Sequence, residues 1–161
     1  MTEGLGEVHL MRIPLDIHRQ TTEHSSEVMR EFAHLAERGA DSHVPSRLLS
    51  LDRALQERYA GFTNTTSSEL DEAVARGDAE IDLTFTLPKD SGQAANELGE
   101  MWDEVDRYCE EGKYLLALRT PPLLVAYRRW FLGEFSRQAS GEPPRSWPDW
   151  AMDCLPDQAD L

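Results

Sequence analysis

The fold is decided by residues 81–111, IDLTFTLPKDSGQAANELGEMWDEVDRYCEE. The first seven residues alternate apolar and polar side chains, which is typical of a strand with one buried face. Asp90 or Ser91 then favours a helix start, and the apolar side chains that follow recur at helical spacing up to Glu111. The predicted buried face of this helix consists of Ala94, Leu98, Met101, Trp102, Val105 and Cys109. Its opposite face is acidic and consists of Glu97, Glu100, Asp103, Glu104 and Glu111.

The rest of the chain predicts two further strands and four further helices. The strands are residues 8–13 and residues 114–118. The helices are residues 15–38, 45–59, 66–76 and 121–138. The resulting order, β-α-α-α-β-α-β-α, indicates an α+β fold, a helix-rich single domain with a small, mostly three-stranded sheet. The strand–helix–strand unit around the acidic helix is long enough for a parallel crossover.

Chain length predicts one globular domain over residues 1–140, because 161 residues usually bury a single core. Residues 141–161 carry four prolines and no hydrophobic periodicity, so we expect a C-terminal tail without regular structure. The tail either packs on the domain or extends from it. Trp147 and Trp150 favour packing, because a disordered tail seldom contains such apolar bulk.

Charge and hydropathy exclude several classes of function. The chain has 30 acidic and 16 basic residues, a net charge of −14 and no Lys/Arg-rich stretch, which disfavours nucleic-acid binding. It lacks the run of about 18 apolar residues that a membrane span needs. Residues 1–6 lack the features of a secretory signal, so we expect a cytoplasmic protein in which Cys109 and Cys154 are reduced. Residues 66–111 hold 14 acids and 3 bases, whereas residues 112–140 hold 1 acid and 5 bases, so folding brings opposite charges together.

One predicted helix carries four potential metal ligands, His24, Glu27, Glu31 and His34. Their spacing of i, i+3, i+7 and i+10 resembles that on the helices of di-metal carboxylate bundles. Such bundles need Glu-x-x-His on a second helix, which this chain lacks, so an ordinary solvated helix face is favoured. His24 lies nearer the apolar stripe than the other three, which predicts a hydrogen-bonded, half-buried imidazole.

Sequence motifs for the commonest enzyme classes are missing. No Gly-x-Ser-x-Gly, Walker or Gly-x-Gly-x-x-Gly motif follows a predicted strand. Cys109 falls on a buried helix face among acids, where a raised pKa predicts an inert thiol. We therefore expect no cofactor and favour a non-enzymatic protein. The alternative is a small metal-dependent or small-molecule-processing enzyme that uses the helix face from His24 to His34.

The motif Asp90-Ser91-Gly92 stands between a predicted strand and a predicted helix. It resembles the phosphorylated serine loop of STAS-type anti-sigma-factor antagonists, and this resemblance makes Ser91 a candidate phosphorylation site. The preceding Pro88-Lys89 departs from the apolar strand end of that family. A plain helix cap is the favoured alternative, because Asp and Ser are preferred at helix N-termini.

A wider resemblance is to a largely uncharacterised actinobacterial family. It rests on Arg12-Ile13-Pro14-Leu15, Glu23-His24, Ile81-Asp82-Leu83-Thr84, Thr120-Pro121-Pro122 and Tyr127-Arg128-Arg129-Trp130-Phe131. Members of that family tend to accompany STAS proteins, serine-kinase anti-sigma factors and PP2C-type phosphatases. The resemblance implies a regulatory setting with a protein partner, such as a regulator of the anti-sigma type, and it assigns no catalytic residue.

The candidate partner surface is rich in Arg and Trp, the residues that anchor many interfaces. It consists of Arg128, Arg129, Trp130, Trp147 and Trp150. In the alternative interpretation, Trp130 and Phe131 fill the core while the two arginines pair with the acidic helix. The sequence as a whole predicts a protein-interaction module in a bacterial sigma-factor or stress-signalling pathway.

Overall fold

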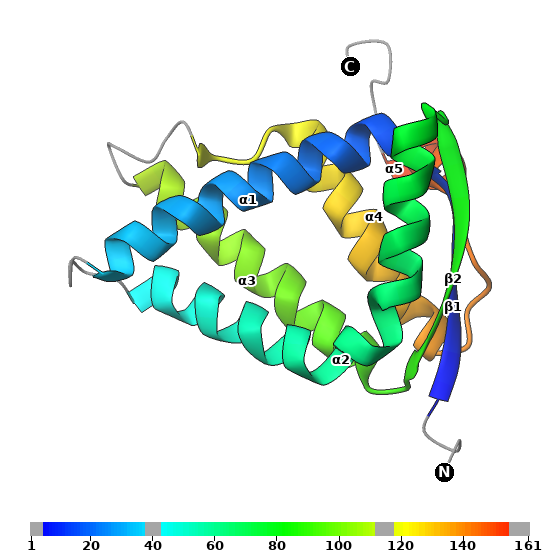
Figure 1. The fold of residues 1–161 in the computed structure, drawn as a ribbon, viewed down its shortest axis with the longest axis horizontal. Helices are drawn as coiled ribbons and strands as arrows, with labels where there is room; N and C mark the ends of the chain where they lie inside the picture. The colour runs from blue at the N-terminus through cyan, green and yellow to red at the C-terminus, as the bar shows by residue number, and fades with distance from the viewer. Residues whose placement is uncertain (1–4, 38–42, 112–117, 155–161) are drawn as a thin grey trace.

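The computed structural model describes residues 5–37, 43–111 and 118–154. Within these ranges the chain is a helix-rich α+β fold with two strands and five helices. The strands are β1 (Leu5–Pro14) and β2 (Glu80–Pro88). The helices are α1 (Leu15–Glu37), α2 (His43–Arg76), α3 (Ser91–Glu111), α4 (Pro122–Ala139) and α5 (Trp147–Cys154). The sheet lies at the right-hand side of the molecule in Figure 1, and α1, α3 and the first part of α2 extend away from it to the left.

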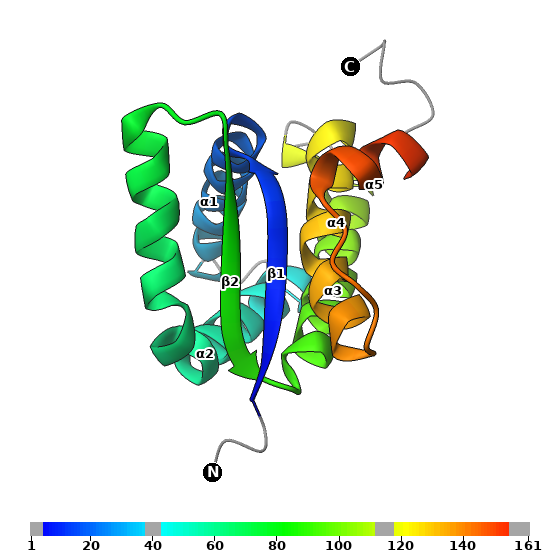
Figure 2. The same ribbon diagram turned by 90° about the vertical axis from the view of Figure 1, so that its right-hand side faces the viewer.

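The two strands pair antiparallel along their whole length, as Figure 2 shows. The register shifts between Leu10 and Ile13, where Arg12 takes a positive φ of 55° and its backbone N–H donates to Asp82 Oδ1 at 2.7 Å. The inward apolar side chains are buried and belong to the core, whereas Asp82, Thr84 and Thr86 on the outer face of β2 are exposed. The buried members are Val8, Leu10, Ile13, Leu83, Phe85 and Leu87. The alternation in residues 81–87 therefore predicted the buried face of β2 correctly.

The expected three-stranded sheet with a parallel crossover is wrong for the described residues, which contain one antiparallel pair. Most of the expected third strand, residues 114–117, lies outside the described residues, and Leu118 belongs to a short turn before α4. The free edge of β1 is occupied by a side chain. The amide of Gln138 on α4 accepts from the backbone N–H of His9 at 2.8 Å and donates to the His9 carbonyl at 2.9 Å. Gln138 thereby binds the backbone N–H and C=O of His9, with which a third strand would have to pair at this edge.

Helix α2 is one bent helix, whereas the sequence predicted two helices separated at Gly61. Figure 1 shows the change of direction within it. The Thr63 hydroxyl donates to the Tyr59 carbonyl at 3.4 Å and the Thr66 hydroxyl to the Thr63 carbonyl at 2.9 Å. Such side-chain bonds to the preceding turn bend helices without ending them. Glycine inside a helix costs about 1 kcal/mol and need not end it.

The core is built around the aromatic residues of α4. Trp130 is 1% exposed, and Tyr127 and Phe135 are also buried, all three in the cluster that contains the inward side chains of both strands. A second cluster, with Val28, Phe32, Leu48 and Val105 among its members, joins α1, α2 and α3 away from the sheet. The prediction that Val105 lies on a buried helix face is thus confirmed.

The C-terminal tail contains a helix, which the sequence analysis did not predict. Trp147 starts α5, is buried against Trp130 with ring centroids 5.9 Å apart, and stacks on Trp150 at 5.6 Å. Trp130 Nε1 donates to the carbonyl of Arg145 at 2.8 Å, which fixes the segment that leads into α5. Pro148 lies in the first turn, where its missing N–H is tolerated. The packing of Trp147 on Trp130 therefore holds residues 147–154 as a helix, although the prolines of the tail predicted an irregular segment.

Candidate functional site

The acidic helix α3 and the basic helix α4 pack side by side through one buried arginine. A single nitrogen of Arg128, Nη2, lies 2.9 Å from Asp103 Oδ1 and 3.1 Å from Asp106 Oδ2. The Arg128 side chain is 9% exposed and that of Asp106 is 15% exposed, so this charge pair is largely removed from water. The opposite charges of the two segments are therefore partly used to hold the fold together.

Thr120 extends this pair into a polar network at the start of α4. Its hydroxyl donates to Asp106 Oδ1 at 2.6 Å, and its backbone N–H donates to the same oxygen at 3.3 Å. Nε2 of His24 on α1 lies 3.2 Å from the Thr120 hydroxyl oxygen. Burial is the main cause that lowers the pKa of His24, which keeps the imidazole neutral. The expected hydrogen-bonded, half-buried His24 is confirmed.

The hydrogen-bonded network of His24, Thr120 and Asp106 holds three segments together, and we call it the clamp. The Thr120 hydroxyl lies between His24 and Asp106 and is held by both, whereas a catalytic triad needs the imidazole between the nucleophile and the carboxylate. Both oxygens of Asp106 accept hydrogen bonds, Oδ1 from Thr120 and Oδ2 from Arg128. The geometry ties α1, α3 and the start of α4 to one another.

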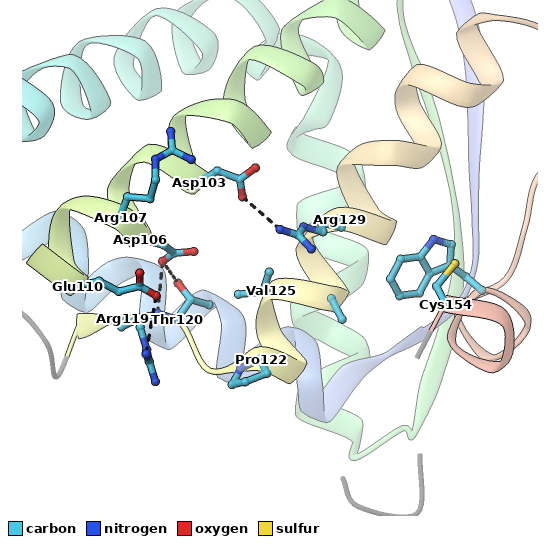
Figure 3. A pocket seen from close by; sticks show the side chains of 12 residues that line it. Asp103, Asp106, Arg107, Glu110, Arg119, Thr120, Pro122, Val125, Arg129 and Cys154 are labelled. Atoms are coloured by element: carbon cyan, nitrogen blue, oxygen red, sulfur yellow. Dashed lines mark hydrogen bonds and ion pairs between the residues drawn. The ribbon is translucent and has the colours of Figure 1, made fainter. Parts of the chain in front are cut away.

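A cleft of about 700 Å³ opens beside this clamp, between α3, α4 and α5 (Figure 3). We call it the charged cleft. Its charged lining residues are Asp103, Asp106, Glu110, Arg107, Arg119 and Arg129. Helix α5 contributes Trp150 and the exposed thiol of Cys154. Three acidic and three basic side chains thus line the same cleft, together with the indole of Trp150.

The arginines of the charged cleft are loosely paired. Arg129 is 65% exposed and its nearest carboxylate oxygen, on Asp103, is 3.9 Å away. Arg119 is 52% exposed and lies 3.7 Å from Glu110. Arg107 makes no ion pair with any described residue. These guanidinium groups keep donors that a ligand or partner could use.

The candidate partner residues divide into two groups. Trp130, Trp147 and Arg128 are buried, so the structure supports the core interpretation for Trp130 and the pairing of Arg128 with the acidic helix. Arg129 and Trp150 line the charged cleft and are accessible from it. Two of the five candidate residues therefore line an open cleft, and three are buried.

The four candidate metal ligands do not form a metal centre. His24 faces Thr120, and no group of three or more His, Cys, Asp or Glu side chains in residues 5–37, 43–111 and 118–154 is placed to hold a metal ion. Glu27, Glu31 and His34 lie on the exposed or half-exposed part of α1. These three residues therefore lie on an ordinary solvated helix face, whereas His24 is held by Thr120, just before the start of α4.

Ser91 is 9% exposed at the start of α3, so its hydroxyl is largely hidden from a kinase. Asp90, the expected helix cap, uses its carboxylate differently, because it pairs with Arg58 and accepts from the Tyr59 hydroxyl at 2.9 Å. These contacts tie the start of α3 to α2. Gly92 is needed for packing, since a Cβ there would lie 2.9 Å from the Ala139 Cβ.

Both cysteines are free, as expected. Burial, assisted by the nearby charge of Asp106, raises the pKa of the Cys109 thiol to about 11. The raised pKa agrees with the one expected from the helix pattern and keeps the thiol protonated at neutral pH.

Sequence reasoning missed Thr120 and Arg119 as members of the site. Thr120 directly precedes the two prolines that predict the start of a helix, and no local pattern links it to Asp106 or to His24, which is 96 residues away in the chain. The charge change from residues 66–111 to residues 112–140 was the one signal that these segments meet.

Comparisons of the chain with family models, with curated proteins and with solved structures found no match. In the described parts of the chain, no helix combines the length and the apolar character that crossing a bilayer requires. The functional interpretation therefore rests on the geometry and on the sequence.

Proposed function

We propose that this chain is a non-enzymatic protein-interaction module whose recognition surface is the charged cleft. The observation that carries the proposal is that Arg129 and Trp150 line one cleft. The neighbouring Arg128 is buried instead and binds Asp103 and Asp106 of α3. Arg129 is mostly exposed, and Trp150 is half-buried and stacked on Trp147. Arg and Trp are the residue types enriched among those that dominate binding energy at protein interfaces.

The two adjacent arginines of α4 have different roles in this proposal. Arg128 is buried and holds both Asp103 and Asp106 at hydrogen-bonding distance. Arg129 touches Asp103 only at 3.9 Å and is mostly exposed. An acidic side chain of a partner can displace this long contact at little cost, because an exposed ion pair stabilises by about 1 kcal/mol or less.

The partner's chemistry follows from the lining. Arg119 and Arg129 favour carboxylates on the partner, and Trp150 on α5 favours an apolar or aromatic side chain. Asp103 and Glu110 line the same cleft and disfavour a uniformly acidic partner. The cleft therefore suits a protein surface of mixed charge that also carries an apolar side chain, and the association should weaken as the salt concentration rises.

The regulatory setting is a further part of the proposal. The resemblance to the actinobacterial family supports a partner that regulates an anti-sigma factor in a bacterial stress pathway. The clamp around Thr120 supports a binding role over catalysis, because its carboxylate and imidazole are both committed to holding the start of α4.

The experiment compares two charge reversals in pull-downs from the organism that encodes the chain. Arg129→Glu removes the proposed contact, and Arg53→Glu makes the same change at an exposed position of α2 outside the cleft. We expect a specific protein to be retained by the wild type and by Arg53→Glu but lost with Arg129→Glu. Equal retention of every bound protein by Arg129→Glu would contradict the proposal.

A further inference from the structure

A second hollow of about 470 Å³ lies between α2 and α4, with β2 and α3 contributing the rest of its wall. We call it the apolar pocket, and it shares no lining residue with the charged cleft. Helix α2 packs on α1, α3 and β2 but makes few contacts with α4, so the space between α2 and α4 is left open. The volume falls in the range of small-molecule sites, which is roughly 300 to 1,000 Å³.

The lining of the apolar pocket carries no Asp, Glu, Lys, Arg or His among its 16 residues. Charged residues make up 29% of the chain, so this uncharged lining stands apart from the rest of the surface. An ion placed in the pocket would lose hydration without gaining an opposite charge from the lining, which is unfavourable. The chemistry of the pocket therefore selects against charged ligands.

The two walls differ in character. The α4 and β2 side presents Phe85, Leu87, Phe131 and Phe135, and Phe85 lies edge-on to Phe135 with centroids 5.4 Å apart. The α2 side presents mainly polar, uncharged groups, including Asn64 and Ser67. A ligand that lies between these walls needs an apolar body on one side and a hydrogen-bonding group on the other.

Some polar groups of the α2 wall are available to a ligand. The Tyr59 hydroxyl already donates to Asp90 at 2.9 Å, and the Thr63 hydroxyl donates within its own helix. The Asn64 amide and the Ser67 hydroxyl are exposed and make no side-chain hydrogen bond with the described residues. They supply a donor and acceptors at the rim of the pocket.

We propose that the apolar pocket binds an uncharged small molecule that combines an apolar chain or ring with one hydrogen-bonding group, such as an alcohol or an amide. This inference goes beyond the protein-interaction function and does not rest on it. It follows from the uncharged lining, from the opposed polar and apolar walls and from a volume suited to a small molecule.

The test uses three probes of equal chain length, 1-octanol, octanoate and octylammonium. Binding is followed by the NMR shifts of the methyl groups of Ala94 and Ala95, which line the pocket. We expect saturable shifts with 1-octanol, and midpoints about tenfold higher or more for both charged probes, because the pocket offers no counter-charge. The absence of saturable shifts with 1-octanol, or equal midpoints for all three probes, would overturn the proposal.

A matched pair of variants locates the binding. Ala60 lines the pocket and Ala54 does not, and both are exposed alanines of α2, so each accepts Glu without burying it. Ala60→Glu should raise the 1-octanol midpoint about tenfold, and Ala54→Glu should leave it unchanged. An unchanged midpoint in Ala60→Glu would refute this site. A concentration-dependent dimer that Ala60→Glu abolishes and that competes with 1-octanol would show that a second copy covers the pocket, which also contradicts the proposal.

Discussion

At the level of single residues, the segment around Gly92 has a packing role that its sequence motif did not indicate. The Asp90-Ser91-Gly92 segment suggested a phosphorylated loop or a helix cap. In the structure, the Asp90 carboxylate binds Arg58 and Tyr59, and Gly92 lets the start of α3 approach α4 closely. A Cβ on Gly92 would lie 3.2 Å from the backbone oxygen of Phe135, which cannot move aside as a side chain can.

Gly92→Ala should therefore lower the free energy of unfolding by about 1 to 3 kcal/mol, as other over-packed core positions do. Gly133→Ala is the matched control, because it lies in α4 with no atom within 4 Å of an added Cβ. That change should stabilise the protein by up to about 1 kcal/mol through helix propensity. Urea denaturation measures both. Equal effects of the two variants would show that the close approach at Gly92 is not a constraint.

The pH dependence of stability is also set at single residues. Nδ1 of His18 lies 2.8 Å from the hydroxyl of Tyr127, and burial lowers the His18 pKa below its ordinary value of 6.5 although the charge of Asp71 opposes this shift. Because the unfolded chain binds the proton first, the stability contributed by neutral His18 is complete above pH 6.5. It is lost as the pH falls from 6.5 towards the lowered pKa of the folded state.

Between pH 6.5 and 5.5, the wild type should lose up to about 1.4 kcal/mol more unfolding free energy than His18→Gln, which keeps a polar side chain but cannot titrate. Urea denaturation at pH 7.5, 6.5 and 5.5 gives the difference directly. His24 has a lowered pKa as well and remains in both proteins, so its contribution cancels in the comparison. Parallel pH profiles for the two proteins would show that His18 is not the titrating group.

At the scale of elements, most helices and both described strands could be predicted from the sequence because their apolar periodicity matches their burial. Leu83, Phe85 and Leu87 of the alternating segment are buried as expected, and so are Met101 and Val105 of the α3 stripe. Ile81, Leu98 and Trp102 of the same predicted faces are half-buried. The failures have physical causes that no local pattern contains. Gly61 lies inside a helix that threonine hydroxyls bend, and Trp147 orders a proline-containing tail by packing on Trp130.

The site was harder to predict than the fold, because its members come from separate elements. The charge asymmetry indicated that α3 and α4 would meet, and Arg128 confirms this with its bonds to Asp103 and Asp106. The sequence did not indicate which of the two adjacent arginines would be buried. That choice depends on the rotation of α4 about its axis, which the packing of Tyr127 and Trp130 fixes.

The clamp at the start of α4 makes its own prediction. Thr120→Val removes the hydroxyl that lies between His24 and Asp106 and keeps the shape of the side chain. We expect the unfolding free energy to fall by about 1 to 3 kcal/mol, because Asp106 loses its shortest hydrogen bond in a largely buried place. Thr86→Val, an exposed change on β2, should alter it by less than about 0.5 kcal/mol. Thermal or urea denaturation that finds no difference between the variants would contradict the clamp.

At the scale of the whole molecule, the chain uses its charges in two ways. A net charge of −14 keeps an acidic exterior, while the basic α4 is partly neutralised where it packs on α3. Arg129 and Arg119 remain mostly exposed in the charged cleft, and the apolar pocket between α2 and α4 carries no charge in its lining. The molecule therefore presents two hollows that differ in charge, the charged cleft proposed for a protein partner and the apolar pocket proposed for an uncharged small molecule.

The most direct test of the proposed function is a calorimetric titration of the partner identified by pull-down into wild type, Arg129→Ala and Arg53→Ala, after melting curves have been recorded for all three. We predict that the three proteins melt alike, because Arg129 and Arg53 are exposed, and that Arg129→Ala alone binds about tenfold more weakly or worse, as expected for an interface anchor. An Arg129→Ala protein that binds the partner as tightly as the wild type would contradict recognition through the charged cleft.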